Sequence, residues 1–216
     1  MTSAPTLRER RTRETRQLIL DAAYAVFARR GYGGAAVDEI LAEAAISKGA
    51  FYHHFASKEA VFQSLLSERA RRCTEAMAGA VDADASLSEN VRNLLRAGWK
   101  LLTSDPAWAN IQMEFWVHAT REEWARVSLA ELLSQCRQFL AQGIDRGRAN
   151  GTIRSQLDPQ AAARLILALS DGIMIQWQIQ PNDVDLDGLI ESMAEMITLY
   201  LTCTQETVRP AKKGAR

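Results

Sequence analysis

Apolar residues recur at helical spacing along almost the whole chain, and this periodicity limits the fold more than any other sequence feature. Within residues 12–30 the apolar positions follow the i, i+3, i+4, i+7 pattern of a helix with one buried face: Ile19, Ala22, Ala23, Val26 and Phe27. Alternating strand patterns and hairpin dipeptides between such segments are essentially missing. The sequence therefore predicts an all-α fold.

Capping residues and helix breakers divide the chain into about nine helices. They are expected over residues 12–30, 37–44, 48–55, 58–79, 87–103, 106–119, 121–150, 159–178 and 186–204. The first can start earlier, because Thr6 and Glu9 have the spacing of a capping box, and Gly31 is expected to stop it. The basic tail, residues 207–216, is expected to be disordered.

Composition excludes several classes of protein. Of 216 residues 47% are apolar and 24% charged, which is enough apolar material for a core and argues against a disordered chain. No apolar run approaches the ~18 residues of a membrane span, and the N-terminus has no secretory signal. Three dispersed cysteines, Cys73, Cys136 and Cys203, indicate buried free thiols in a cytoplasmic protein, with neither a disulfide framework nor a metal site.

Residues 31–62 contain two short helices joined by a tight turn, which is the helix-turn-helix arrangement. In the second helix Phe51 and Phe55 can face a core. The opposite side then presents a cation, a small residue and two polar rings: Lys48, Gly49, Tyr52 and His53. Such a helix fits the major groove of DNA, with its N-terminal residues leading.

These residues also carry a family resemblance. The string from Ser47 to Phe55, SKGAFYHHF, followed by Ser57, Lys58 and Glu59, resembles the signature of TetR-type transcriptional regulators. The resemblance implies a DNA-binding domain over residues 1–57 and an effector-binding and dimerisation domain over 58–206. It further implies a ligand-responsive regulator, most simply a repressor, that binds a palindromic double-stranded DNA operator as a homodimer and is released by an effector. That effector is expected to be a small hydrophobic molecule, because all the tryptophans crowd into one part of the chain.

Two positions depart from the family pattern. Ala36 stands where the family usually has a threonine that caps the second helix, and Ala45 replaces the glycine of the turn. An alanine offers no cap, and it tolerates a left-handed backbone less well than glycine does.

The candidate DNA contacts lie mostly on the third helix. They are Arg13, Lys48, Gly49, Ala50, Tyr52, His53, His54 and Lys58. His54 can equally serve in packing. The arginines between Arg8 and Arg16 can form a minor-groove arm, contact phosphates from the first helix, or make solvated i, i+4 pairs. Adjacent histidines point in different directions, so His53 and His54 are not expected to bind a metal.

All five tryptophans lie between residues 99 and 177, which indicates either an ordinary core or a ligand cavity. The residues expected to line the cavity are Trp99, Phe115, Trp116, His118 and Trp177. Further polar contacts can come from Gln112, Glu114 and Gln176.

The helix expected over residues 159–178 is apolar almost all round, so we expect it to be buried against its own domain and a second subunit. The expected dimer contacts are Leu165, Leu169, Gly172, Ile173, Met193 and Ile197. Asp171, in this apolar setting, is expected to hydrogen-bond across the interface or to meet a cationic ligand.

Two other functions are weighed against DNA binding. An enzyme built on a helical bundle is disfavoured, because no catalytic triad, phosphate-binding loop or metal-ligand pair is present. A purely structural helical protein would be indifferent to the loss of Lys48 and Tyr52. The sequence predicts a regulator that is not an enzyme and needs no cofactor.

Overall fold

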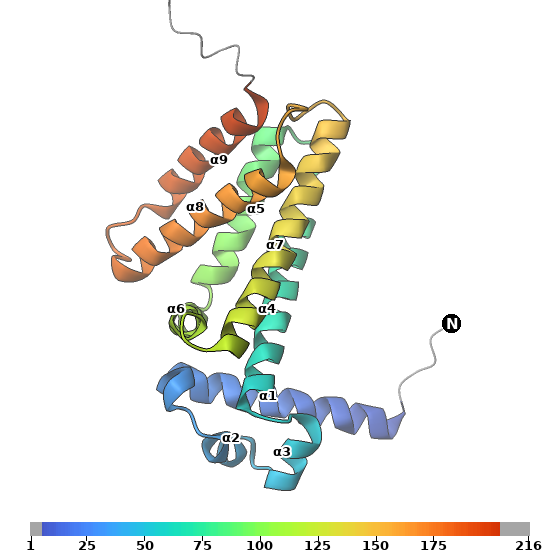
Figure 1. Cartoon of the computed structure of the whole chain (residues 1–216), viewed down its shortest axis with the longest axis vertical. Coiled ribbons are helices and arrows are strands. Elements are labelled where there is room, and N and C mark those ends of the chain that lie inside the picture. Colours follow the sequence, from blue (N-terminus) through green and yellow to red (C-terminus); the bar gives the residue numbers. More distant parts are fainter. Residues whose placement is uncertain (1–5, 204–216) are drawn as a thin grey trace, which may run out of the picture. The chain divides into compact units, whose positions relative to one another are not determined.

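The computed structural model describes residues 6–203, which form nine helices and no strand (Figure 1). The all-α prediction is confirmed. The helices are α1 (Leu7–Gly34), α2 (Val37–Ala44), α3 (Lys48–His54), α4 (Lys58–Gly79), α5 (Leu87–Thr103), α6 (Pro106–Ala119), α7 (Glu123–Ala149), α8 (Pro159–Ile179) and α9 (Leu186–Thr202). The basic tail expected to be disordered lies outside the described residues.

The first helix begins at Leu7, five residues before the start expected at residue 12. Thr6 Oγ1 accepts the Glu9 N–H at 3.3 Å, while the Glu9 carboxylate accepts the Thr6 N–H at 2.7 Å. This capping box fixes the start of α1. At Gly31 the backbone leaves the helix with φ 70°, so the expected stop is a break followed by one more turn to Gly34.

The described residues fall into two compact units that do not follow sequence order. The first contains the residues up to Cys73 together with Leu102–Leu133. The second contains Thr74–Leu101 and the residues from Ser134 onward. Because Pro106–Ala119 lies wholly in the first unit, α6 belongs with the helix-turn-helix rather than with the later helices.

The core of the first unit is aromatic. Phe27 of α1, Phe51 of α3, Phe62 of α4 and Phe115 of α6 are all essentially inaccessible to solvent. The ring of Phe62 lies 5.4 Å from that of Phe27 and 4.7 Å from that of Phe115, centroid to centroid. Four helices therefore meet on one cluster, and burial of each phenyl ring stabilises the unit by roughly 1.5–3 kcal/mol.

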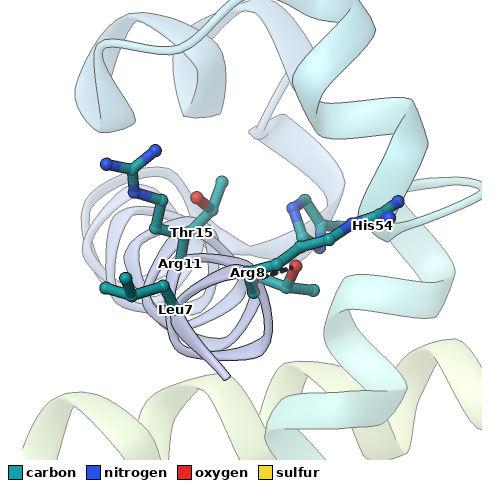
Figure 2. A pocket seen from close by; sticks show the side chains of 6 residues that line it. Leu7, Arg8, Arg11, Thr15 and His54 are labelled. Carbon is teal, nitrogen blue, oxygen red and sulfur yellow. Dashed lines mark hydrogen bonds between the residues drawn. The ribbon is translucent and has the colours of Figure 1, made fainter. Parts of the chain in front are cut away.

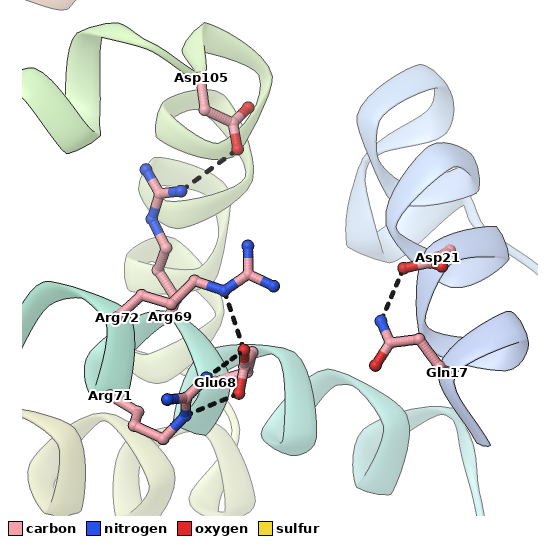
Figure 3. A network of polar contacts seen from close by, with 7 residues as sticks. All are labelled: Gln17, Asp21, Glu68, Arg69, Arg71, Arg72 and Asp105. Carbon is pink, nitrogen blue, oxygen red and sulfur yellow. Dashed lines mark hydrogen bonds and ion pairs between the residues drawn. The ribbon is translucent and has the colours of Figure 1, made fainter. Parts of the chain in front are cut away.

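A carboxylate at the start of α6 attaches this helix to two others. Asp105 caps α6 by accepting the Trp108 N–H at 3.1 Å. It also accepts the hydroxyl of Tyr24 on α1, and pairs with Arg69 of α4 at 3.3 Å (Figure 3). Burial, together with this hydrogen bond to Asp105, raises the pKa of Tyr24 to about 12. The N-terminus of α6 is thus held against α1 and α4.

In the second unit, α8 and α9 lie side by side (Figure 1). Their inner residues, among them Ala162, Met174, Met193 and Ile197, are buried within the chain itself. The outer sides keep large apolar residues in solvent: Leu165, Ile179, Met196 and Leu199.

The three cysteines are free thiols, as expected. Cys73 and Cys136 are half-buried, but Cys203 is exposed, so the prediction that all three are buried was wrong. The physical reason is its position, since Cys203 directly follows the last residue of α9 at the end of the described chain. Among the described residues no helix has both the length and the apolar character needed to cross a bilayer.

Candidate nucleic-acid interface

The turn between α2 and α3 is tight because Ala45 adopts a left-handed conformation, with φ 50° and ψ 44°. Its N–H and that of Ile46 return to carbonyls in the last turn of α2. Ser47 then caps α3 by accepting the Ala50 N–H at 3.2 Å. The left-handed turn that a glycine would favour therefore forms with alanine.

Ala36 provides no side-chain cap for α2, as expected from its missing hydroxyl. Glu39 compensates in part, because its carboxylate accepts the Ala36 N–H at 3.0 Å. The helix thus starts at the expected residue, Val37, with the Glu39 half of a capping box and without the hydroxyl half that a threonine would supply.

The third helix has one buried and one exposed side. Phe51 and Phe55 face the core, whereas Lys48, Gly49 and His53 are exposed. Tyr52 keeps 48% of its surface in solvent, with its ring 5.2 Å from that of Phe51. Ala50 is half-buried. The helix therefore presents an ammonium, an imidazole and a phenol together on its free side, all of which can donate hydrogen bonds.

A row on α1 adds cations beside the end of α3. Leu7, Arg8, Arg11, Thr12, Thr15 and His54 line a hollow of about 420 Å³ (Figure 2). Four of these residues, 8, 11, 12 and 15, follow the i, i+3, i+4, i+7 spacing of one helix side. Burial, followed by the charges of His53 and Arg16, lowers the pKa of His54. The hollow is accordingly lined by two guanidinium groups and an imidazole.

Other cations near α3 are already engaged within the protein. Arg16 donates to Ser64 Oγ at 3.0 Å and lies over the ring of Phe55. Lys58 Nζ donates to the carbonyls of Tyr32 and Ala35 at 2.9 and 2.8 Å, and burial lowers its pKa. Lys58, expected to contact DNA, therefore has its ammonium directed into the chain. Arg13 is exposed on α1 but does not line the hollow.

The five residues expected to line an effector cavity do not lie in one compact unit. Phe115, Trp116 and His118 belong to the first unit, and Trp99 and Trp177 to the second. Phe115 is fully buried against Phe62 and Trp124.

His118, expected to be a polar anchor for the effector, has its ring 5.2 Å from that of Tyr32. Its Nε2 is 3.8 Å from a carboxylate oxygen of Glu114. Trp116 and Trp177 are half-buried and Trp99 is buried.

The expected dimer contacts divide into inner and outer residues. Ile173, Met193 and Ile197 are buried within their own chain. Leu165 is 57% exposed, whereas Leu169 and Gly172 are half-buried. The sequence analysis missed Ile179, Met196 and Leu199, which are exposed apolar residues on the same two helices.

Sequence reasoning also missed the individual α1 residues of the hollow and treated the arginines as one run. The i, i+3, i+4, i+7 spacing of residues 8, 11, 12 and 15 was the available signal. It did not show which helix side would meet α3.

Two family models match consecutive parts of the chain. A family model described as "Bacterial regulatory proteins, tetR family" matches residues 19–65, which include α2 and α3. A second, "BetI-type transcriptional repressor, C-terminal", matches residues 87–202. Together these models cover most of the described chain.

Individual relatives are regulators of bacteria. The chain is 29% identical over 199 residues to the A-factor receptor protein of Streptomyces griseus, covering 86% of this chain and 63% of that protein. It is 28% identical to the HTH-type transcriptional repressor DhaR of a Mycobacterium species, covering 84% of this chain and 91% of DhaR.

A solved structure extends the likeness to the whole fold. The transcriptional regulator FadR of Bacillus subtilis, in complex with stearoyl-CoA, superposes with a TM-score of 0.73 and 26% identity, covering 84% of this chain and 97% of that one. The two family models and the relatives are all transcriptional regulators, which fits the helix-turn-helix and its exposed side. They also fit the expectation that the protein is not an enzyme. The chain belongs to the TetR family of transcriptional regulators.

Proposed function

We propose that the protein is a ligand-responsive repressor that binds a palindromic operator as a homodimer through α3. The observation that carries this proposal is the free side of α3, where Lys48, Gly49, Tyr52 and His53 are exposed together. An ammonium is suited to phosphate, while the phenol and the imidazole can read base edges. Because the operator lies in the bacterial cell interior, we assign the protein to the cytoplasm.

Gly49 supports this role, because the fold itself does not need a glycine there. A Cβ at this position would have only Ser47 Oγ nearby, at 3.9 Å. Packing within the chain therefore leaves room for a side chain. The close approach of a DNA backbone is a physical reason for keeping this position small.

The α1 row extends the proposed interface. Arg8 and Arg11 line the same hollow as His54, with Arg8 extending past the imidazole and Arg11 directed to the other side (Figure 2). Their guanidinium groups can contact phosphates on the flank of the groove. With the interface extended in this way, we retain Arg13 as a flanking contact and Ala50 as a small residue near the groove. We remove Lys58, whose ammonium is held by two carbonyls.

The effector is proposed to be a small hydrophobic molecule bound among the later helices. One relative supports this, because FadR was solved with stearoyl-CoA, which carries a long apolar chain. The name of DhaR supports repression rather than activation. Trp99 and Trp177, which both lie in the second unit, remain the proposed wall residues, and Trp116 of the first unit is not retained with them. Phe115 and His118 drop out, because the first is packed in the core and the second lies against Tyr32 and Glu114.

The experiment that tests the DNA role is selection of bound sequences from random duplex DNA, followed by fluorescence anisotropy on the enriched site. We expect a palindrome. If ~6–10 phosphates are contacted per dimer, affinity falls ~10³–10⁵-fold between about 50 and 200 mM salt. Failure to enrich any sequence, or affinity that is indifferent to salt, would overturn the proposal.

Two groups of variants separate positioning from reading. Lys48→Ala should weaken the selected operator and a scrambled duplex alike, because a phosphate contact carries no sequence information. Tyr52→Phe and His53→Ala should also relax base preference in a repeated selection. A matched control is Lys100→Ala, which removes one cation from α5, far along the sequence from α3.

A further inference from the structure

The corner between α1 and α2, residues 31–35, is held by a carboxylate from a distant part of the sequence. Glu114 of α6 accepts the Tyr32 N–H at 2.9 Å through one oxygen and the Gly33 N–H at 3.0 Å through the other. Because α1 breaks at Gly31, the first N–H groups of the following turn need acceptors outside the helix. Glu114 therefore caps the last turn of α1 from another helix.

Gly31 makes room for this carboxylate. A Cβ on Gly31 would clash with all three terminal atoms of the Glu114 side chain. The backbone there also has φ 70°, a value that L side chains rarely adopt. The missing side chain of Gly31 and the position of Glu114 thus fit each other.

The other side of the same corner is held by α4. Lys58 donates to the carbonyls of Tyr32 and Ala35, with its ammonium 4.4 Å from the centre of the Tyr32 ring. The Tyr32 hydroxyl donates to Glu59 at 3.3 Å. N–H groups on one side and carbonyls on the other are therefore both bound by ionisable side chains, which leaves the corner little freedom.

The corner leads directly into the DNA-reading helices. Ala35 and Ala36 are the only residues between the end of α1 and the start of α2. The turn at Ala45 then fixes α3 to α2. Any displacement of the corner must therefore carry the recognition helix with it.

We infer that Glu114 is a positioning residue for operator recognition, although it lies on α6, outside the helix-turn-helix. This inference rests on the proposed function, because it requires a specific operator. Glu114 sets the direction in which α2 leaves α1. Asp105, at the N-terminal end of α6, accepts the hydroxyl of Tyr24 on α1. Two carboxylates of α6 thus align α1 before DNA is bound, and this preorganisation favours sequence-specific contacts.

The test compares Glu114→Ala with Glu131→Ala, an exposed acidic residue of α7 in the same unit. Both variants remove one negative charge, so each changes the net charge of the protein by the same amount. Affinity is measured by anisotropy for the selected operator and for a scrambled duplex at equal salt. We expect Glu114→Ala to lose about tenfold in operator affinity with little change on the scrambled duplex, whereas Glu131→Ala keeps the wild-type ratio.

A conservative variant and a double-mutant cycle exclude a merely structural role. Glu114→Gln keeps one oxygen acceptor, so its operator affinity should fall between those of wild type and Glu114→Ala. Gly31→Ala displaces the carboxylate and also strains the backbone at φ 70°, so its loss should be smaller, though not zero, when Glu114 is already alanine. All measurements are made well below each unfolding midpoint, and amide exchange at Tyr32 and Gly33 should accelerate in Glu114→Ala.

Several outcomes overturn the inference. Glu114 does not position the reading helices if Glu114→Ala loses affinity equally for both duplexes, or loses none for either. The same conclusion follows if the affinity losses of Gly31→Ala and Glu114→Ala are fully additive. If Glu114→Ala does not fold, the intermediate affinity ratio of Glu114→Gln decides the question. If wild-type protein fails to bind any selected duplex, the proposed function falls as well, which separates the two failures.

Discussion

At Ala45 the chain uses a residue that its backbone conformation disfavours. The φ of 50° brings the methyl group close to the following carbonyl, and such left-handed geometry costs an L-residue about 1–2 kcal/mol. The surrounding contacts of α2 and α3 outweigh this cost, since Ile40 and Phe51 are fully buried on either side of the turn.

Ala45→Gly should therefore stabilise the protein. The relief of strain exceeds the extra entropy of glycine in the unfolded chain, so we expect the free energy of unfolding to rise by about 0.5–1 kcal/mol. Urea denaturation followed by circular dichroism measures the change. Ala42→Gly, at an exposed helical position three residues earlier, should instead lower it by about 1 kcal/mol. A loss at both positions would contradict this account of the turn.

Gly49→Ala should change stability and DNA binding in opposite directions. The new methyl group has space within the chain and improves helix propensity, so the free energy of unfolding should rise by about 0.5–1 kcal/mol. Operator affinity should fall, because the methyl group occupies the space proposed for the DNA backbone. Thermal denaturation and anisotropy on one preparation check both signs, and unchanged operator affinity would remove Gly49 from the interface.

Asp171 should make stability fall as the pH rises. Burial raises its pKa from 3.8 to about 6, so between these values the folded protein binds more protons than the unfolded chain. The contribution of Asp171 to the free energy of unfolding is therefore fully present below pH ~4, and it is lost as the pH rises through ~6.

At pH 7 Asp171→Asn should therefore raise the free energy of unfolding, by on the order of 2 kcal/mol, and flatten its dependence between pH ~4 and ~6. Denaturation curves across this range provide the measurement. Asp183→Asn, at an exposed loop position, serves as the control and should leave the pH dependence of wild type unchanged. If the free energy of unfolding depends on pH equally in Asp171→Asn and wild type, the raised pKa does not belong to Asp171.

At the scale of single elements, local chemistry determined most of the fold. The bounds of α2, α4, α5 and α6 agree with the sequence analysis to the residue. Two of these helices, α4 and α6, begin where Ser57 and Asp105 cap them with short-range hydrogen bonds. The two sides of α3 also followed from spacing alone, since Phe51 and Phe55 are four residues apart.

Contacts between distant elements were beyond reach of the sequence. Nothing local distinguishes Glu114 as the partner of Tyr32, 82 residues away, from the other carboxylates of the chain. Lys58 likewise sits in a family motif, where its charge suggested phosphate rather than the carbonyl of Ala35. Phe115 was taken for a cavity wall because aromatic content alone does not separate a wall from a core.

At the scale of the whole molecule, α8 and α9 carry exposed apolar residues suited to a second copy. The expected outcome is a homodimer that Leu165→Glu dissociates, because the carboxylate would be buried without a partner. Sedimentation at micromolar concentration measures the mass. Val81→Glu, at an equally exposed apolar position outside α8 and α9, should remain dimeric. Wild-type protein at 24.0 kDa would contradict the dimer.

The attachment of α6 to α1 also determines which piece of this protein can be exchanged between regulators. A chimera joined directly after α3 would place the reading helices on a foreign scaffold without the carboxylates of Asp105 and Glu114. Tyr24 would then lose its acceptor, and the turn after Gly31 would lose its cap. The transferable module therefore includes residues 102–133. Chimeras that carry this segment should keep the operator specificity of this protein, whereas chimeras without it should lose that specificity.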